Sequence, residues 1–350
     1  MTATGVRESI LNLFRQSPEG YLSGERLSEV LGVSRTAVWK QIQQLRQLGY
    51  RIEALPSRGY RLSATPDLPL AEELRQGLTT RVIGREIRYL AVTDSTNRQA
   101  YTLGEAGAEE GLVFIAEEQS AGKGRLGRSW ASPPGVNLYL SVVLRPPLPP
   151  HAAPQMTFLS ALAVSRTITA VTGLAPTHKW PNDVLLGGAK VAGLLNEMSA
   201  ESDRIRFVVL GIGVNLNMTA GQFPPDLRAP ATSLFIATGQ LVARAQFART
   251  LLAELDSLYA EFLLRGPAPI MADWEARCDL VGKPVSIEGQ GGAARCGVVA
   301  GIDRDGALLL TLADGTTERI LAGDVRPLAG AQSPSTNNQQ PIAGNPKPCC

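Results

Sequence analysis

The sequence of 350 residues contains few of the side chains that dominate metal centres and nucleophilic active sites. It has two histidines, far in sequence from four cysteines. Neither residue type shows the spacing of a zinc site or of a disulfide framework. We therefore predict no metal ion bound by the protein, and structural or incidental roles for the cysteines. The residues in question are His151, His178, Cys278, Cys296, Cys349 and Cys350.

Long hydrophobic runs are also missing. No segment approaches the roughly 18 apolar residues of a membrane helix. The N-terminal segment MTATGVRESILNLFRQ carries Glu8 and Arg15 among its apolar positions, unlike a secretory signal. Hydrophobic residues make up 44% and charged residues 19% of the chain, as in a soluble globular protein. We expect a cytoplasmic protein without membrane association, and the length predicts two or three domains.

Positive charge is concentrated at the N-terminus. The chain has a formal net charge of +2, whereas residues 1–66 contain nine Lys or Arg and five Asp or Glu. Apolar residues at helical spacing, with Ser23 and Ser34 as N-caps and Gly32 and Gly49 as breaks, predict three helices within residues 7–49. Segments 50–54 and 59–62 predict a two-stranded wing. This order indicates a winged helix-turn-helix that binds DNA.

The third helix would enter the major groove and contact phosphates and base edges. Its outward residues are Arg35, Thr36, Trp39, Lys40 and Gln43, and Arg58 lies at the tip of the wing. The inward faces of the helices would be formed by Ile10, Leu11, Leu13 and Phe14, by Leu27, Val30 and Leu31, and by Val38, Ile42 and Leu45. The alternative is an ordinary three-helix packing module whose charges are solvated.

A proline-containing stretch, ATPDLP at 64–69, predicts a domain boundary near residue 66. Beyond it, strands are predicted at 86–91, 112–117, 137–144, 185–186, 191–197 and 207–214, and helices at 97–104, 156–173 and 245–264. Several strands follow one another without an intervening helix. This order favours an α+β fold with a mixed sheet over a doubly wound fold.

From residue 282 the pattern changes to short strands at 285–287, 294–302, 308–312 and 317–321, which are typical of a small β-barrel. The segment after Gly330, which includes SPSTNNQQPIAGNPKP, lacks apolar periodicity and is predicted to be disordered. The predicted domains are therefore 1–66 for DNA binding, 67–275 for the central mixed sheet and 276–329 for the barrel, followed by a tail at 330–350.

The stretch AGKGRLGRSW at 121–130 contains a G-x-G-x-x-G pattern, which is usually attributed to dinucleotide binding. A dinucleotide turn must open a helix and precede an acidic residue by roughly 20 positions. Here SPPG at 132–135 prevents a helix, and prolines occupy the later position. The phosphate loop pattern G-x-x-x-x-G-K-[ST] does not occur either. What remains is a glycine-rich loop with three cations, suited to phosphate or carboxylate oxygens. A solvated surface loop is the alternative.

Two further stretches place polar residues at turns. THKWPNDV at 177–184 and the following strand bring two lysines near a Pro-Asn turn, where they could stabilise an acyl phosphate during transfer. TDSTN at 93–97 ends a strand and begins a helix, so its hydroxyls and N–H groups can face a ligand. Simple capping by Asp94 or Ser95 is the alternative for the second stretch.

These stretches together resemble the biotin protein ligases, and the N-terminal module resembles the bifunctional class that also represses biotin operons. The matching segments are DSTN at 94–97, EEQSAGKGRLGRSW at 117–130, KWPND at 179–183, KVAGLL at 190–195 and GIGVNLN at 211–217. The resemblance extends from about residue 7 to residue 328. It implies a catalytic domain similar to class II aminoacyl-tRNA synthetases and an SH3-like C-terminal barrel.

The resemblance also implies substrates and partners. Biotin and ATP, with Mg²⁺, would form biotinyl-5′-AMP, and the biotinyl group would pass to a lysine of the biotin carboxyl carrier protein of acetyl-CoA carboxylase. Biotinyl-5′-AMP would act as corepressor and promote a homodimer that binds operator DNA. A lipoate ligase, and a regulator that senses a nucleotide without catalysis, are the competing hypotheses.

The site residues follow from the same resemblance. Biotin would be held by Ser95, Thr96, Asn97, Gln119, Lys123, Gly124, Arg125 and Lys190. The nucleotide would be held by Arg125, Arg128, Trp130, Lys179, Asn182 and Asn215. Lys190, Arg125 and Arg128 would serve catalysis. GIGVN at 211–215 would floor the biotin tail, and residues 218–233 would cover the adenylate. Lys123 is a departure, because the family commonly has arginine there, so adenylate retention could differ.

Overall fold

The computed structural model describes residues 3–17, 20–227, 229–288 and 294–328. The chain divides into two compact units, one of residues 1–279 with 304–306 and the other of residues 280–303 with 307–350. The tail predicted for residues 330–350 lies outside the described part of the chain. None of the described helices is long and apolar enough to cross a membrane.

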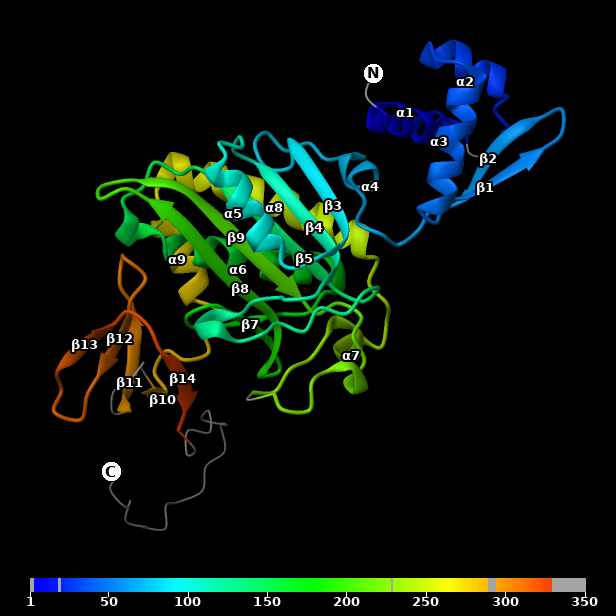
Figure 1. Ribbon diagram of the computed structural model, residues 1–350. Coiled ribbons are helices and arrows are strands. Elements are labelled where there is room, and N and C mark those ends of the chain that lie inside the picture. Colours follow the sequence, from blue (N-terminus) through cyan, green and yellow to red (C-terminus); the bar gives the residue numbers. More distant parts are fainter. Residues whose placement is uncertain (1–2, 18–19, 228, 289–293, 329–350) are drawn as a thin grey trace. The chain divides into compact units, whose positions relative to one another are not determined.

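The N-terminal segment forms the predicted helix-turn-helix and wing (Figure 1). Its elements are α1 (Ala3–Gln16), α2 (Gly24–Leu31), α3 (Arg35–Gln47), β1 (Arg51–Leu55) and β2 (Gly59–Ala64). The hydroxyl of Ser23 accepts the N–H of Arg26 and that of Ser34 accepts the N–H of Ala37, as N-caps do. Gly32 ends α2 at a positive φ of 64°. Local capping and turn chemistry therefore fix the angle between α2 and α3.

One predicted core residue of this module is wrong. Val30 is 48% exposed, whereas Val33 packs against the buried cluster that contains Leu27 and Leu31. The helix stops at Leu31, and the left-handed turn at Gly32 brings the next valine inward. Helical spacing alone could not show that exchange. The other predicted inward residues are buried or packed against the cluster.

A mixed sheet forms the centre of the first unit. Its strands are β3 (Glu86–Thr93), β4 (Leu112–Gln119), β5 (Leu138–Leu144), β6 (Thr177–Lys179), β7 (Asp183–Leu186), β8 (Ala189–Ala200) and β9 (Ile205–Val214). Their order is β3-β4-β5-β9-β8-β7-β6, and β3 runs parallel to β4 whereas the other pairs are antiparallel. The predicted α+β class with a mixed sheet is confirmed.

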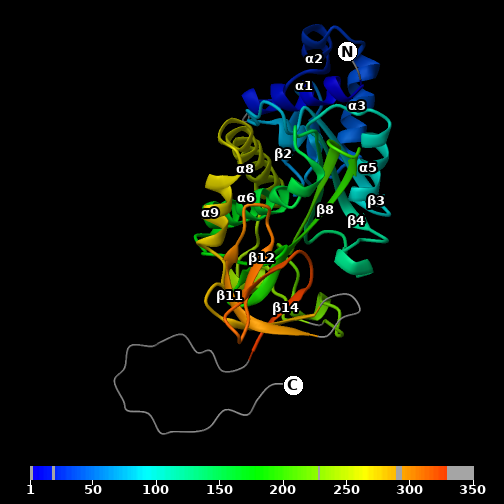
Figure 2. The same ribbon diagram turned by 90° about the vertical axis from the view of Figure 1, so that its left-hand side faces the viewer.

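Helices cover both faces of this sheet. Figures 1 and 2 show α5 (Thr96–Glu105) on one face, with α6 (Gln155–Thr172) and α8 (Arg244–Arg265) on the other. Every residue of β5 is buried, because this strand lies between two neighbours and under helices. The same sandwiching explains the broad apolar surface of α6, which packs against the sheet, α8 and α9 (Ala268–Glu275).

The segment after residue 66 forms ion pairs and hydrogen bonds with the N-terminal helices on one side and with α8 on the other. The short helix α4 (Ala71–Arg75) has two buried carboxylates: Glu72 pairs with Arg7 at 3.1 Å and Glu73 with Arg15 at 2.6 Å. On the other side, the guanidinium of buried Arg244 donates to the carbonyl of Asp67 at 2.6 Å and to Glu117 at 3.0 Å. The stretch therefore connects the N-terminal helices to α8 through charged contacts.

The second unit is an antiparallel sheet with the order β13-β12-β11-β10-β14. Its strands are β10 (Pro284–Glu288), β11 (Arg295–Ile302), β12 (Leu308–Thr311), β13 (Thr317–Ile320) and β14 (Asp324–Pro327). The four strands predicted here are present, and β14 was not predicted. The other unpredicted elements, α4, α7 (Leu234–Thr238), α9 and β6, are also short, so their sequences show little periodicity.

Candidate functional site

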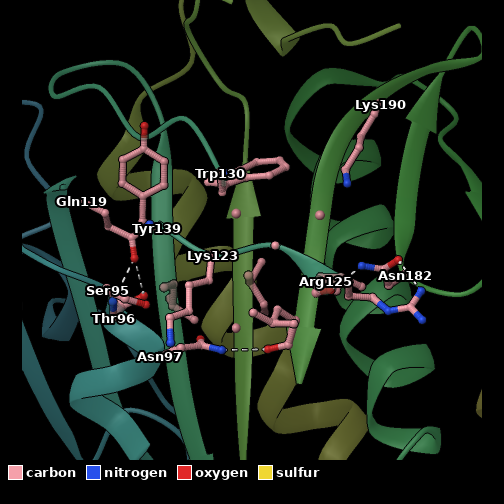
Figure 3. Close-up of a pocket in the computed structure, with 18 residues that line it drawn as sticks. Ser95, Thr96, Asn97, Gln119, Lys123, Arg125, Trp130, Tyr139, Asn182 and Lys190 are labelled. Carbon is pink, nitrogen blue, oxygen red and sulfur yellow. Dashed lines mark hydrogen bonds between the residues drawn. The ribbon is translucent and has the colours of Figure 1, made fainter. Parts of the chain in front are cut away.

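The candidate site is a pocket between the N-terminus of α5, the loop after β4, strands β5, β8 and β9, and the turn before β7 (Figure 3). Figure 3 shows Ser95, Thr96 and Gln119 on one side and Arg125 and Lys190 on the other, with Lys123 between them. The residues that line it are Ser95, Thr96, Asn97, Gln119, Lys123, Gly124, Arg125, Trp130, Tyr139, Leu140, Asn182, Lys190, Gly193, Leu194, Leu195, Gly211, Ile212 and Gly213.

The polar end is built on the first turn of α5. Ser95 occupies the N-cap position, but its side chain makes no capping hydrogen bond. Instead the N–H of Thr96 donates to Oε1 of Gln119 at 2.8 Å, and the N–H of Ser95 donates to Asp94 at 2.7 Å. Hydrogen bonds from Gln99 and Ser95 lower the pKa of Asp94. The capping alternative is therefore not confirmed, because Asp94 accepts the N–H of Ser95 and not one from the first turn of α5, and the buried Ser95 hydroxyl lies at the pocket.

Gln119 is fixed by neighbours on both sides. Its Oε1 accepts from Thr96, and its Nε2 donates to Ser132 Oγ at 2.9 Å. The Ser132 hydroxyl in turn donates to the carbonyl of Trp130 at 3.0 Å. Because both ends of the amide have defined partners, its orientation follows from the hydrogen bonds. This series of hydrogen bonds thus links Thr96 in the pocket to Trp130 at the end of the glycine-rich loop.

The glycine-rich loop carries two cations into the pocket. Lys123 and Arg125 both line it, and Nη1 of Arg125 lies 3.4 Å from Oδ1 of Asn182. Arg125 begins a 3₁₀ turn of residues 125–127, within which Leu126 has a φ of 57°. A non-glycine residue in this left-handed region carries backbone strain, and such residues cluster at ligand-binding loops. No helix follows the loop over the described residues 128–137, in agreement with the sequence argument against a dinucleotide turn.

Lys190 is the best-anchored cation of the site. Its Nζ lies 2.6 Å from Oδ1 of Asp183 and 5.2 Å from the centre of the Trp130 ring. A carboxylate and an aromatic face both favour an ammonium group. In the antiparallel pairing of β7 with β8, Lys190 lies opposite Leu185, two residues along the strand from Asp183. A cation held in this way can stabilise negative charge that develops on a substrate.

The floor of the pocket requires glycine. A Cβ on Gly211 would lie 2.1 Å from Oδ1 of Asn97, and one on Gly213 would lie 2.6 Å from the Trp130 ring. Tyr139, which the sequence argument missed, closes the wall and donates from its hydroxyl to the carbonyl of Pro133 at 2.9 Å. Burial raises the pKa of Tyr139. Tyr139 lies in β5, which pairs with the strand β9 that carries the GIGVN segment, and this pairing could not be known without the strand order.

The structure brings most of the predicted site residues together. Arg128, Lys179 and Asn215 are the exceptions, because they do not line the pocket. Asn215 is buried and donates to the carbonyl of Thr232 at 3.1 Å, so it holds the loop that follows β9. In the N-terminal module, Arg35, Thr36, Trp39, Lys40 and Arg58 are exposed and Gln43 is half-buried. Their exposure leaves one side of α3 and the wing open to a ligand.

Family models match three parts of the chain. Residues 89–215 match the Biotin/lipoate A/B protein ligase family, residues 6–61 match an HTH domain, and residues 280–326 match the Biotin protein ligase C terminal domain. The first match contains the polar end, the loop and the lysine of the pocket described above. The three matches thus cover the N-terminal module, the mixed sheet and the antiparallel sheet of the second unit.

Individual relatives agree with these matches. The chain is 38% identical to the bifunctional ligase/repressor BirA of Bacillus spizizenii, over 91% of this chain and 98% of that protein. It is 40% identical to the biotin--[acetyl-CoA-carboxylase] ligase of Paracoccus denitrificans, over 63% and 92%. The Aquifex aeolicus biotin protein ligase, solved with biotin and ATP, superposes with a TM-score of 0.59 at 27% identity, over 70% and 99%. The chain therefore belongs to the family of bifunctional biotin protein ligases and repressors.

Proposed function

We propose that the pocket holds biotin and ATP with their reacting groups between the loop cations and Lys190. Thr96 and Gln119 would hold the ureido ring of biotin, since both lie at the polar end and carry hydrogen-bonding groups. Glycines of the floor would leave room for the aliphatic tail. The observation that carries this assignment is that one pocket has the neutral polar side chains of Ser95, Thr96 and Gln119 on one side and the cations Arg125 and Lys190 on the other (Figure 3). Biotin has the same polarity, with a neutral ring and a terminal carboxylate.

The reaction would proceed in two steps. A carboxylate oxygen of biotin attacks the α-phosphorus of ATP, which forms biotinyl-5′-AMP and releases pyrophosphate. The neutral amine of an acceptor lysine then attacks the acyl carbon, an amide forms, AMP leaves with the bonding electron pair, and the amine loses one proton to solvent. Lys190, with Arg125 and Lys123, would stabilise the charge on the carboxylate and phosphate oxygens in both steps. Mg²⁺ would enter with ATP, bound mainly through phosphate oxygens and water.

The acceptor would be the lysine of a biotin carboxyl carrier domain, as the names of the carboxylase ligase relatives suggest. Incubation with biotin, ATP, Mg²⁺ and a carrier-domain fragment should add one biotinyl group to the fragment, measured as intact mass. A fragment whose acceptor lysine is replaced by arginine is the matched control. A parallel incubation contains lipoate in place of biotin, because the matched family also includes lipoate ligases. Transfer of lipoate without biotin would contradict the proposal.

The repressor activity would use the exposed side of α3 and the wing. Biotinyl-5′-AMP would promote a homodimer, so that two modules meet a two-fold operator. A gel shift with the upstream DNA of the protein's own biotin genes should show a complex that strengthens when biotin and ATP are both added. Adenylate formation without any such DNA complex would leave the ligase proposal intact and contradict repression. Biotin, ATP and DNA are all available in the cytoplasm, which we propose as its location.

A further inference from the structure

A buried serine lies behind the polar end of the pocket. Ser141 belongs to β5, is fully buried, and is not among the residues that line the pocket. Its Oγ lies 2.6 Å from Oδ1 of Asn97 and 2.8 Å from Oγ1 of Thr96. A serine hydroxyl has one proton and two lone pairs, so it can fully donate to only one of these two atoms. Which atom receives the proton decides how Thr96 faces a ligand.

The amide of Asn97 settles that question. Its Nδ2 donates to the carbonyl of Leu195 at 3.0 Å and to the carboxylate of Glu197 at 2.8 Å. Both partners are acceptors, so a flipped amide would place its oxygen against two other oxygens. Oδ1 of Asn97 therefore faces Ser141 and can only accept. The Ser141 proton belongs to this shorter contact.

The hydroxyl proton of Thr96 is consequently held within the protein. It has two acceptors there, Oγ of Ser141 at 2.8 Å and Oε1 of Gln119 at 3.1 Å. Gln119 Oε1 already accepts the backbone N–H of Thr96, and the Ser141 oxygen has a lone pair available because its own proton is committed. Either arrangement turns the Thr96 proton away from the pocket. Thr96 then offers a lone pair to the pocket, which suits an N–H donor.

We infer that Ser141 is a positioning residue for biotin, which it recognises indirectly by keeping Thr96 as an acceptor for a ureido N–H. This inference rests on the proposed function, since it assigns the polar end to the ureido ring. Loss of the Ser141 hydroxyl removes the nearer acceptor of Thr96 and leaves Oδ1 of Asn97 without its donor. Of its two acceptors, the Thr96 hydroxyl then keeps only Oε1 of Gln119, which is farther away at 3.1 Å and is shared with the backbone N–H of Thr96. The hydroxyl is held less firmly, so its proton can turn towards the ureido N–H, which weakens binding.

The test measures biotin affinity by calorimetry on the full chain and the KM for ATP in pyrophosphate exchange. Ser141→Ala should raise the Kd for biotin roughly tenfold, the scale of one hydrogen bond, with the KM for ATP within about twofold of wild type. Ser160→Ala is the matched control, because Ser160 is also fully buried in this unit but donates to the carbonyl of Met156 within its own helix. It should leave both constants within about twofold.

A double-mutant cycle separates positioning from general damage. Thr96→Val removes the hydroxyl on which Ser141 acts, so adding Ser141→Ala to that variant should raise the Kd no further. Ser141→Cys, which leaves no cavity and keeps only a weak donor, should show a smaller rise than alanine and carries the test if Ser141→Ala does not fold.

Three outcomes would overturn the inference. The first is a biotin Kd for Ser141→Ala that equals the Kd of the Ser160→Ala control; if Ser141→Ala does not fold, the same comparison is made with Ser141→Cys. The second is a rise in the KM for ATP that parallels the rise in the biotin Kd. The third is full additivity of the effects of Ser141→Ala and Thr96→Val on the biotin Kd. The wild-type chain distinguishes this failure from failure of the proposed function. If the wild type shows biotin-dependent pyrophosphate exchange and the Ser141 variant has the wild-type Kd for biotin, only the role of Ser141 is contradicted. If the wild type shows no biotin-dependent exchange, the proposed function itself is contradicted.

Discussion

The ammonium group of Lys190 lies 2.6 Å from the carboxylate of Asp183, on adjacent antiparallel strands. The two side chains are 27% and 22% exposed, so the pair is only partly screened by solvent. Asp183 thereby holds in place the cation that we assign to charge stabilisation. The pair also explains why an acidic residue ends the KWPND segment beside a site for anionic substrates.

Replacement of Asp183 by asparagine should slow adenylation. The amide keeps the shape of the carboxylate but not its charge, so Lys190 is held less firmly. We expect roughly a tenfold lower rate at saturating biotin and ATP, measured by pyrophosphate exchange. Asp273→Asn is a matched control, because Asp273 pairs with Arg166 at 2.9 Å and does not line the pocket. Equal rates for the two variants would remove the role of Asp183.

Arg125→Gly should release biotinyl-5′-AMP into solution. The residue lies between Gly124 and Gly127, so glycine would leave the loop little restraint, and its contact with Asn182 would be lost. In a single-turnover experiment, adenylate dissociation should be at least about tenfold faster while adenylate still forms. Arg204→Gly, on an exposed turn where Arg204 pairs with Glu201, should release adenylate at the wild-type rate. Full retention by Arg125→Gly would contradict the proposed loop function.

His178 should make the folded state sensitive to acid. It is fully buried, stacks on Trp274, and contacts Ser165 at 2.7 Å, and burial lowers its pKa to about 4. Between an unfolded pKa of about 6.5 and the folded value, the unfolded state binds more protons, so stability falls as the pH falls. The loss would approach about 3 kcal/mol by pH 4.

The measurement for His178 is urea unfolding of the wild type and of His178→Gln between pH 4 and pH 8. The glutamine variant cannot take up this proton, so its free energy of unfolding should fall less steeply from pH 6.5 to pH 4. The difference in slope should approach about 1.4 kcal/mol per pH unit. Parallel curves would show that another group causes the acid sensitivity.

Glu73→Gln should destabilise the N-terminal module. The Glu73 carboxylate accepts from Arg15 at 2.6 Å and from the buried hydroxyl of Tyr50, whose pKa is raised by burial and by this carboxylate. Removing the charge leaves Arg15 poorly compensated, at a cost of about 1–3 kcal/mol. Glu53→Gln is the control, since its pair with Arg61 is exposed and should contribute little. Hydrogen exchange of α1 and α3 measures both variants.

Lys40→Ala should weaken DNA binding uniformly across sequences. Lys40 is exposed on α3, where it can contact a phosphate. The slope of log affinity against log salt concentration should then fall by about one. Gln47→Ala provides a neutral control on the same helix. An unchanged slope for Lys40→Ala would place the phosphate contacts elsewhere.

The sequence predicted the long elements and the fold class, because their periodicity is strong. It also predicted Ser95, Thr96, Gln119, Arg125 and Lys190 as pocket residues, since these belong to contiguous motifs. It could not predict Tyr139 or Ser141, because both lie in a continuously buried strand whose residues look alike until the neighbouring strands are known. It could not predict α4 either, since the partners of its carboxylates lie more than 50 residues away.

The double fastening of residues 67–83 makes this segment a rigid spacer. Asp256 accepts the N–H groups of Arg81, Val82 and Ile83, and Arg249 donates to the carbonyl of Gln76. The segment is therefore hydrogen-bonded to α8 at several points along its length. One residue inserted into α4 would rotate its two carboxylates by about 100° away from their arginines. Helical phase, rather than the number of residues alone, therefore determines which insertions between the DNA-binding module and the ligase are tolerated.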